Sequence, residues 1–179
     1  MKSLRFALPF VLLALSTAAV AQSDAQKSFD AIKALAGTWE GRATLDPPNA
    51  KMGSDAPTRV SLRVTSRGNA IVHEMGELDS AKDPTKYDHP VTMLYLDEGR
   101  LLLTHYCDAG NRPRMAGKLS EDGKTIDFDL LDVAGPTQYG HMQHAKFTIV
   151  DDNHHVEDWT FLMPGDKLMR GHIDLQRTK

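Results

Sequence analysis

Strand-like alternation dominates this sequence from Thr38 to its end. Short runs rich in valine, isoleucine, threonine and aromatic residues show a period of two, and turn residues divide them. Because successive side chains of a strand point to opposite faces, this period predicts half-buried β-strands. About ten strands are expected, near residues 38–45, 59–66, 70–78, 92–96, 100–107, 114–119, 125–131, 141–150, 155–163 and 167–176.

Tight turns link most of these strands. The tetrapeptides SRGN, DEGR, EDGK, DDNH and PGDK supply the Gly, Asn and Asp residues that turns with positive φ require. Consecutive hairpins form a meander, and a flat meander of this length would leave two edges exposed. The sequence therefore predicts an all-β fold, a single up-and-down antiparallel barrel of about ten strands.

A short amphipathic helix precedes the strands. Phe29, Ile32 and Leu35 have helical spacing in the segment SDAQKSFDAIKALAG, where Ser23 or Asp24 can cap the helix and Gly37 can end it. We expect this N-terminal helix to lie across one end of the barrel or on its rim.

The first 21 residues have the features of a secretory signal peptide. Lys2 and Arg5 are basic, residues 6–20 are almost all apolar, and the tripeptide AVA at 19–21 is a small-x-small cleavage site. The apolar run is shorter than the roughly 20 residues that a membrane-spanning helix needs. The prediction is a periplasmic or secreted protein, with one barrel domain over residues 22–179 and no membrane anchor after cleavage.

Charge and cysteine content narrow the function classes. Without Lys2 and Arg5, 19 basic residues remain against 24 acidic ones, a formal charge of −5. This acidic balance, with no basic stripe in the sequence, argues against a nucleic-acid partner. Cys107 is the single cysteine and has no internal disulfide partner, so it is either a buried inert side chain or a functional thiol.

Two connections are longer than hairpin turns. They are DPPNAKMGSDAPT at residues 46–58 and DSAKDPTKYDHP at residues 79–90, both rich in proline and aspartate. At one mouth of a barrel, such loops are either lids over a bound ligand or plain solvated connections.

The segment LAGTWEG, residues 35–41, resembles the Gly-x-Trp start of lipocalin-like (calycin) barrels. In that family the tryptophan of the first strand plugs the closed end and packs against a basic residue from the last strand. The resemblance implies these two roles for Trp39 and for Arg177 in LQRTK.

A wider set of segments, GTWEG, HEMGE, LTHYCDAGNRPRM, GHMQH and VEDWTF, is similar to bacterial secreted proteins of uncharacterised function, grouped with the DUF1579-type and nitrobindin-like barrels. This resemblance covers most of the mature chain and implies the fold without an established activity. In the nitrobindins proper a histidine of the last strand ligates haem, which would correspond to His172. The other residues of that haem pocket have no match in this sequence.

Alternation places several polar residues on faces that also carry apolar side chains. His105 and Cys107 share the face of an aliphatic run at residues 101–103, and Glu157 shares the face of Trp159. Polar groups that converge inside an apolar barrel form either a ligand pocket or a satisfied hydrogen-bond network. The candidate ligand-binding residues are His105, Cys107, Arg114, His141, Glu157 and Trp159.

Arg114 belongs to this set only under one condition. Arg112 and Arg114 alternate with Pro113 and Met115, so both would face solvent in a regular strand. A bulge after the turn DAGN would turn one of them inward, where its guanidinium would bind Glu157 or an anionic ligand.

The remaining histidines offer weaker patterns. HEMGE begins like a zinc-protease motif, but the second histidine is absent and the segment has strand alternation, which places His73 on the face of Ile71 and Met75. The adjacent His154 and His155 are expected in a solvated turn.

A metal site would need His105 and His141 with Glu157 or Cys107, and no ligand pair has a recognised spacing. A Cys107–His105 nucleophile pair is equally unsupported by any peptidase signature.

The leading hypothesis is a periplasmic or secreted barrel protein that binds a small, partly apolar or amphipathic molecule in its interior. One alternative is an enzyme that uses the same pocket, of the isomerase or cyclase type or assisted by haem or a metal, with His105, Cys107 or His172 in the chemistry. Another is a protein-interaction module that uses the long loops and has a well-filled interior. The ligand, any cofactor and the oligomeric state stay open.

Overall fold

The N-terminal helix forms as its spacing predicts. In the computed structural model, which describes residues 23–48, 55–77, 83 and 85–178, helix α1 spans Asp24–Ala34. The Ser23 side chain caps it: its Oγ accepts a hydrogen bond from the backbone N–H of Gln26 at 3.2 Å. Phe29 and Ile32 are buried on one face, so the helix is held by that face. The predicted signal peptide, residues 1–21, lies outside the described residues.

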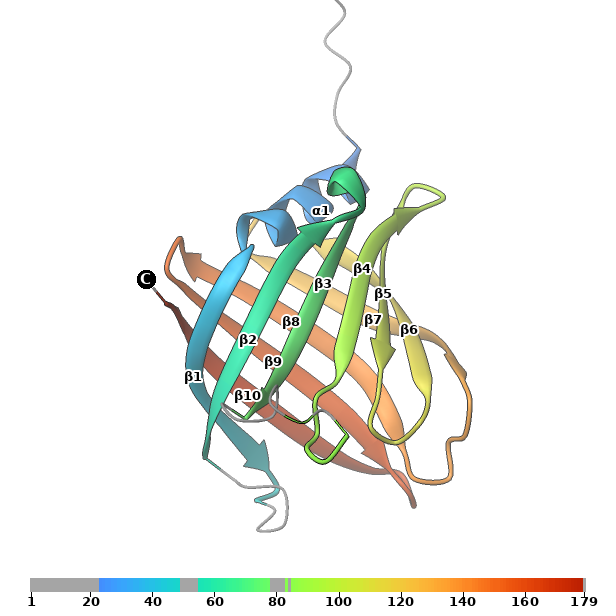
Figure 1. Ribbon diagram of the computed structural model, residues 1–179. Coiled ribbons are helices and arrows are strands. Elements are labelled where there is room, and N and C mark those ends of the chain that lie inside the picture. Colours follow the sequence, from blue (N-terminus) through green and yellow to red (C-terminus); the bar gives the residue numbers. More distant parts are fainter. Residues whose placement is uncertain (1–22, 49–54, 78–82, 84, 179) are drawn as a thin grey trace, which may run out of the picture.

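Ten antiparallel strands follow, as the alternation predicts (Figure 1). A single 3-10 turn, η1 at Ser66–Gly68, separates the second strand from the third. The strands are β1 (Gly37–Asp46), β2 (Ala56–Thr65), β3 (Ala70–Glu77), β4 (Val91–Asp97), β5 (Arg100–Tyr106), β6 (Arg112–Leu119), β7 (Thr125–Ala134), β8 (His141–Asp151), β9 (His154–Met163) and β10 (Lys167–Arg177).

The sheet closes on itself. Each strand pairs with its neighbours in sequence, and the first strand, β1, also pairs with the last, β10, in the register Trp39 to Arg177. The predicted up-and-down barrel is therefore confirmed, and each of the ten described strands has a paired strand on both sides. Within the described part of the chain, no helix is long and apolar enough to cross a membrane.

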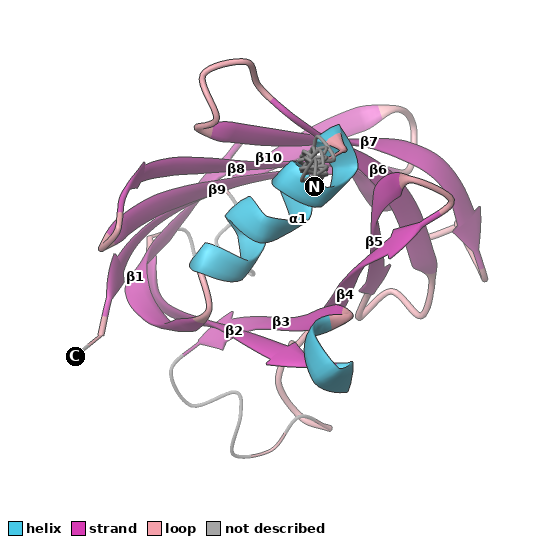
Figure 2. Cartoon of the chain, turned by 90° about the horizontal axis from the view of Figure 1, so that it is seen from above, coloured by secondary structure: helices cyan, strands magenta, loops and turns pink. Residues whose placement is uncertain are grey.

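The two ends of the barrel differ. Helix α1 lies across one end, as Figures 1 and 2 show, and the short turns at 66–69, 98–99, 120–124 and 152–153 are at this closed end. The opposite, open end carries the longer connections, 47–55 and 78–90, and parts of both lie outside the described residues. Whether these loops act as lids stays a prediction.

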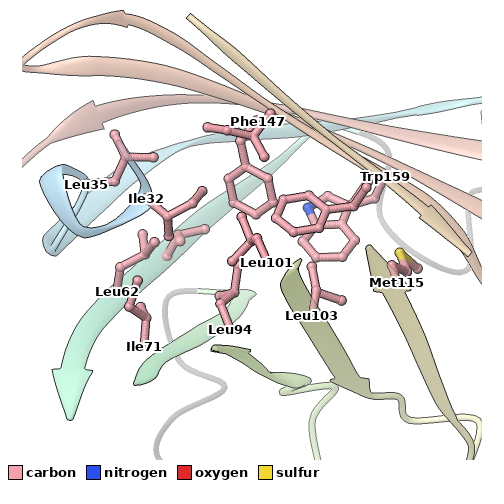
Figure 3. Close-up of a cluster of buried hydrophobic side chains, with 14 of the residues drawn as sticks. Ile32, Leu35, Leu62, Ile71, Leu94, Leu101, Leu103, Met115, Phe147 and Trp159 are labelled. Carbon is pink, nitrogen blue, oxygen red and sulfur yellow. The ribbon is translucent and has the colours of Figure 1, made fainter. Parts of the chain in front are cut away.

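Below the helix, the interior is a sealed apolar core. Ile32 and Leu35 contact aliphatic side chains from β2 to β5, and Phe147 and Trp159 complete the cluster from the other wall (Figure 3). Thirteen side chains of the cluster have no measurable exposure: Ile32, Trp39, Val60, Ile71, Leu94, Leu101, Leu103, Met115, Ile126, Phe128, Ala145, Phe147 and Leu175. Burial of each large apolar side chain contributes about 1.5–3 kcal/mol, so this half of the barrel stabilises the fold.

Trp39 on the first strand, β1, contacts Arg177 on the last strand, β10. The Arg177 guanidinium lies 4.0 Å from the Trp39 ring centroid. It also donates hydrogen bonds to the carbonyl oxygens of Ala36 (2.8 Å), Ala34 (3.2 Å) and Asp152 (2.8 Å). The contact that the lipocalin-like resemblance implies is present, and it fixes the end of α1 to the closing strand pair.

Both glycines of the GTWEG segment have a steric reason. Gly37 has φ of +145°, and a Cβ there would lie 2.5 Å from Nη1 of Arg177. At Gly41, a Cβ would lie 1.7 Å from the carbonyl oxygen of Asp174 on β10. The positive φ favours glycine at position 37, and the close approach of β1 to the β10 backbone requires glycine at position 41.

Replacing Arg177 with alanine should lower the free energy of unfolding by about 2–3 kcal/mol, because three hydrogen bonds and a cation–π contact are lost together. Urea denaturation followed by far-UV circular dichroism measures this loss. Arg177→Lys should retain only part of the stability, because an ammonium cannot reproduce the planar fork. An equal loss for alanine at the exposed Arg63 would contradict a specific role for Arg177.

Candidate functional site

A layer of polar side chains crosses the barrel interior, from His155 beside Trp39 near the closed end to His105 near the open end. Its residues come from β3, β4, β5 and β9, and all are buried: His73, Thr92, His105, His155, Glu157 and Trp159. Alternation predicts three of them as ligand-binding candidates, His105, Glu157 and Trp159, and the structure brings these three together. Alternation also places His73 on the face of Ile71 and Met75, and His73 is buried in the structure.

Glu157 is the centre of this polar layer. Its carboxylate accepts hydrogen bonds from Nε2 of His73 at 3.0 and 3.1 Å, from Nε2 of His155 at 3.1 Å and from Nε1 of Trp159 at 3.0 Å. His73 is on β3, and three strands separate β3 from β9 on the shorter way around the barrel. The carboxylate therefore connects opposite walls.

The electrostatics of Glu157 are set by this shell. Burial on its own would raise the pKa of the carboxyl group, but His73 and His155 outweigh it through charge and hydrogen bonds, and hold the pKa of Glu157 below its usual range. The charged carboxylate thus belongs to the folded state, and each oxygen already has at least two partners.

His105 lies beside this group with a different partner. Its Nδ1 is 2.8 Å from the Thr92 hydroxyl, and its ring centroid is 5.3 Å from that of Trp159. Burial, with a smaller contribution from His73, lowers the pKa of His105 to about 3. His105 is therefore neutral at physiological pH.

The unpaired nitrogens of the polar layer fall into two kinds. Nδ1 of His73 and Nδ1 of His155 are sealed from solvent and make no hydrogen bond. Nε2 of His105 also has no hydrogen-bond partner among the described residues, but it is not among the sealed atoms. His105 is thus the histidine of this layer with a nitrogen available to a bound molecule.

Beyond the polar layer, toward the open end, the inner face becomes apolar and partly exposed. We call this region the open-end surface. It consists of Ala43, Leu45, Met75, Leu130, Met142, Phe161, Met163, Met169 and Gly171, which are half-buried except for Met169 at 7 % exposure. Four of these nine residues are methionines, whose flexible side chains adapt to different shapes.

Gly171 is a position on this surface that has room for a Cβ atom. It pairs with Leu45 and Trp159, whose side chains share its face. A Cβ at Gly171 would come no closer than 3.7 Å to any neighbouring atom, and no positive φ requires glycine there. A side chain could therefore extend from this position over the open-end surface.

Arg114 does not join the polar layer. A bulge does occur in the pairing of β6 with β7, between Arg114 and Met115, but it is Met115 that is fully buried. The Arg114 guanidinium pairs instead with Asp132 on the neighbouring strand, where both side chains are about half exposed. The inward orientation considered for Arg114 is therefore not observed.

A second bulge displaces His141. The pairing of β8 with β9 shifts between Met142 and His144, so Met142 and not His141 packs against the core cluster. His141 pairs with Leu162 on the opposite face, and its Nδ1 lies 2.9 Å from the carbonyl oxygen of Met142. Regular alternation through residue 143, which put His141 inside, fails at this bulge.

Cys107 directly follows β5 at the open end and is half-buried. Burial raises the pKa of its thiol, and the carboxylates of Asp88 and Asp108 add to the increase. A reactive cysteine needs the opposite shift, so these surroundings do not favour a nucleophilic role.

His172 lies on the outer face of β10. Its Nδ1 is 2.7 Å from a carboxylate oxygen of Asp158, and about half of its side chain is exposed. The histidine that the nitrobindin resemblance points to is thus outside the barrel. It borders a shallow hollow of about 460 Å³ whose lining also includes Thr44, Lys146 and Arg170 and, from the inward-facing set, Leu45, Trp159 and Gly171.

Sequence reasoning missed two members of the polar layer. His155 was expected in a solvated turn, but it is fully buried, 4.2 Å from the Trp39 ring centroid in edge-to-face contact. Its shared face with Glu157 and Trp159 was the available signal. Thr92 could have been identified in the same way, because it shares a strand face with the apolar Leu94.

Across the part of the chain that the structure describes, no cluster of three or more His, Cys, Asp or Glu residues is arranged to hold a metal ion.

Glu157→Ala should lower the free energy of unfolding by about 3–5 kcal/mol, because it leaves two buried histidines without their acceptor. Equilibrium urea denaturation measures the change. The matched control is Glu40→Ala, which breaks an exposed pair with Arg59 and should change stability by less than about 1 kcal/mol. Similar losses in the two variants would show that the buried carboxylate has no special structural role.

Stability should fall as the pH drops below about 6.5, because unfolded His105 takes up a proton that the folded form binds only near pH 3. Down to pH 5 this single group contributes a loss of about 2 kcal/mol. His105→Gln removes the titration, so its stability should depend less on pH between 6.5 and 5. Parallel profiles for the two proteins, measured by denaturation at each pH, would contradict a buried neutral His105.

Comparisons with known proteins support the fold and leave the function open. No family profile and no curated protein matches the sequence. Among solved structures, Rv2717c from M. tuberculosis is similar with a TM-score of 0.58 and 14 % identity, over 85 % of this chain and 98 % of that one. A protein of unknown function from the DUF3598 family of Nostoc punctiforme PCC 73102 has a TM-score of 0.55 and 10 % identity, over 82 % of this chain and 49 % of that one. At these identities the likeness concerns the ten-stranded barrel architecture alone.

Proposed function

We propose that this protein binds a small, partly apolar molecule inside the open end of its barrel. The observation that carries the proposal is the change along the inner face, from a sealed apolar core, through a polar layer, to the half-buried open-end surface. Ligand sites are mostly apolar with a few convergent polar groups, and this end of the barrel has that composition.

The division of the interior supports one end over the other. Under α1 the core side chains have no exposure, so a ligand there would have to displace packed residues. The open-end surface already exposes Leu45, Phe161 and Met163 in part, and its methionines can repack around a guest. An interaction module with a completely filled interior fits this arrangement less well.

We also propose that the chain is a secreted or periplasmic member of the lipocalin-like barrels, related to the DUF1579-type and nitrobindin-like proteins. The Trp39–Arg177 contact and the preceding helix support the lipocalin-like relation. The apolar start of the sequence, with its AVA cleavage site, supports export. Sequencing the N-terminus of the exported protein tests the cleavage after residue 21.

Binding at the open end should quench the fluorescence of Trp159, which borders the open-end surface, and spare Trp39 at the closed end. Titration with 1-bromooctane, an uncharged quencher, should reduce the tryptophan emission of the wild-type protein. Trp159→Phe, in which Trp39 is the remaining tryptophan, should show no quenching. Quenching that persists in folded Trp159→Phe would contradict the site.

Filling the space at Gly171 should abolish this binding without unfolding the protein, because a Cβ there meets no close contact. Gly171→Phe should lose quenching by 1-bromooctane and keep its circular dichroism spectrum. The matched control, Arg170→Phe, places the same ring one residue earlier, on the opposite face of β10; both residues border the hollow beside His172, so the pair of variants compares the two faces of the strand. Loss of binding in Arg170→Phe alone would move the site to that opposite face.

A further inference from the structure

We propose that the bound molecule carries an uncharged hydrogen-bonding head group, a hydroxyl or a carbonyl, that binds Nε2 of His105, and that the site rejects carboxylates. This inference rests on the proposed function, since it assigns the ligand class and the residue that selects it. It is carried by the position of His105, by the partners of the neighbouring polar groups and by the placement of the cationic side chains.

His105 is held in place as an anchor. It is the last buried residue of β5, the Thr92 hydroxyl occupies its Nδ1, and the Trp159 ring lies 5.3 Å away between centroids. These contacts fix the ring, and Nε2 is then the nitrogen left for a ligand. Trp159, whose ring contacts the His105 ring, pairs with Gly171 of the open-end surface. His105 therefore lies where the polar layer meets the open-end surface.

The other polar groups of the layer are already engaged. Nε2 of His73, Nε2 of His155 and Nε1 of Trp159 all bind the Glu157 carboxylate. The remaining Nδ1 atoms of the two histidines are sealed from solvent. A head group that enters from the open end therefore meets His105 as its hydrogen-bond partner.

The chemistry of His105 favours an uncharged partner. A neutral imidazole has one donor and one acceptor nitrogen, and the Thr92 hydroxyl can either donate to Nδ1 or accept from it. Nε2 therefore serves as donor or acceptor with the matching tautomer. A ligand hydroxyl can bind Nε2 in either tautomer, and a carbonyl can bind the tautomer in which Nε2 is the donor. Both groups are uncharged.

A carboxylate would find no lysine or arginine here, since none of the described lysines and arginines is buried in the interior. Arg114 pairs with Asp132 on the outer face. Lys167, at the exposed start of β10, is four residues from Gly171, a strand length of about 13 Å. His73 and His155 are already engaged by the Glu157 carboxylate. An anionic head group would lose its water without gaining a guanidinium or ammonium partner, which is strongly unfavourable.

Competition between matched ligands tests the inference. The uncharged dye N-phenyl-1-naphthylamine reports on occupancy, and 1-decanol and decanoate, with the same chain length, compete for it at pH 7. Decanol should displace the dye at a concentration at least about tenfold below that of decanoate, since one net hydrogen bond contributes about 1 kcal/mol and the uncompensated anion loses more.

Two variants assign this preference to His105. In His105→Leu the affinity for decanol, relative to that for the dye, should fall by about fivefold, whereas His105→Gln keeps a side-chain hydrogen-bonding group and should retain part of the preference. The glutamine variant also serves if the leucine variant does not fold. His172→Leu makes the same change on the outer face and should behave as the wild-type protein does.

The outcomes separate the two proposals. If the dye does not bind, or binds equally to Gly171→Phe, the proposed function fails. If the dye binds and is lost in Gly171→Phe but decanoate competes as well as decanol, the open-end site stands and the uncharged head group is overturned. An unchanged decanol preference in both folded His105 variants would overturn His105 as the anchor.

Discussion

The buried carboxylate of Glu157 is the interaction around which the interior is organised. A charge sealed inside a barrel is stable only when its oxygens have enough partners, and His73, His155 and Trp159 supply them from two walls. Because His73 comes from β3 and Glu157 from β9, the ionic contact also fixes the distance between opposite strands. Barrel closure brings these groups together, and their pairing in turn holds the closed barrel.

This polar layer divides the interior into two functional halves. Above it, α1, Trp39 and Arg177 close the barrel over a core with no exposure. Below it, Gly171 and the methionines leave an apolar surface that is only partly covered. The closed half stabilises the fold, and the open half is where we propose that a ligand binds. His105 lies at the boundary and belongs to both.

Much of this arrangement could be predicted, and the failures have a common cause. Alternation predicted ten strands, the barrel and the inward position of His105, Glu157 and Trp159, since a strand's period is local. It failed for His141 because a bulge adds one residue and exchanges the two faces. It also failed for His155, a residue after a turn, whose burial depends on the approach of Trp39.

The sequence by itself determined the strand pattern and the capped helix, because each follows from local backbone geometry and side-chain spacing. Only the tertiary structure decided which polar groups meet. His73 and Glu157 are 84 residues apart, and their hydrogen bond exists because the barrel closes at one register. Register, bulges and closure depend on every strand at once, so the pairing of interior charges cannot be obtained from any single segment.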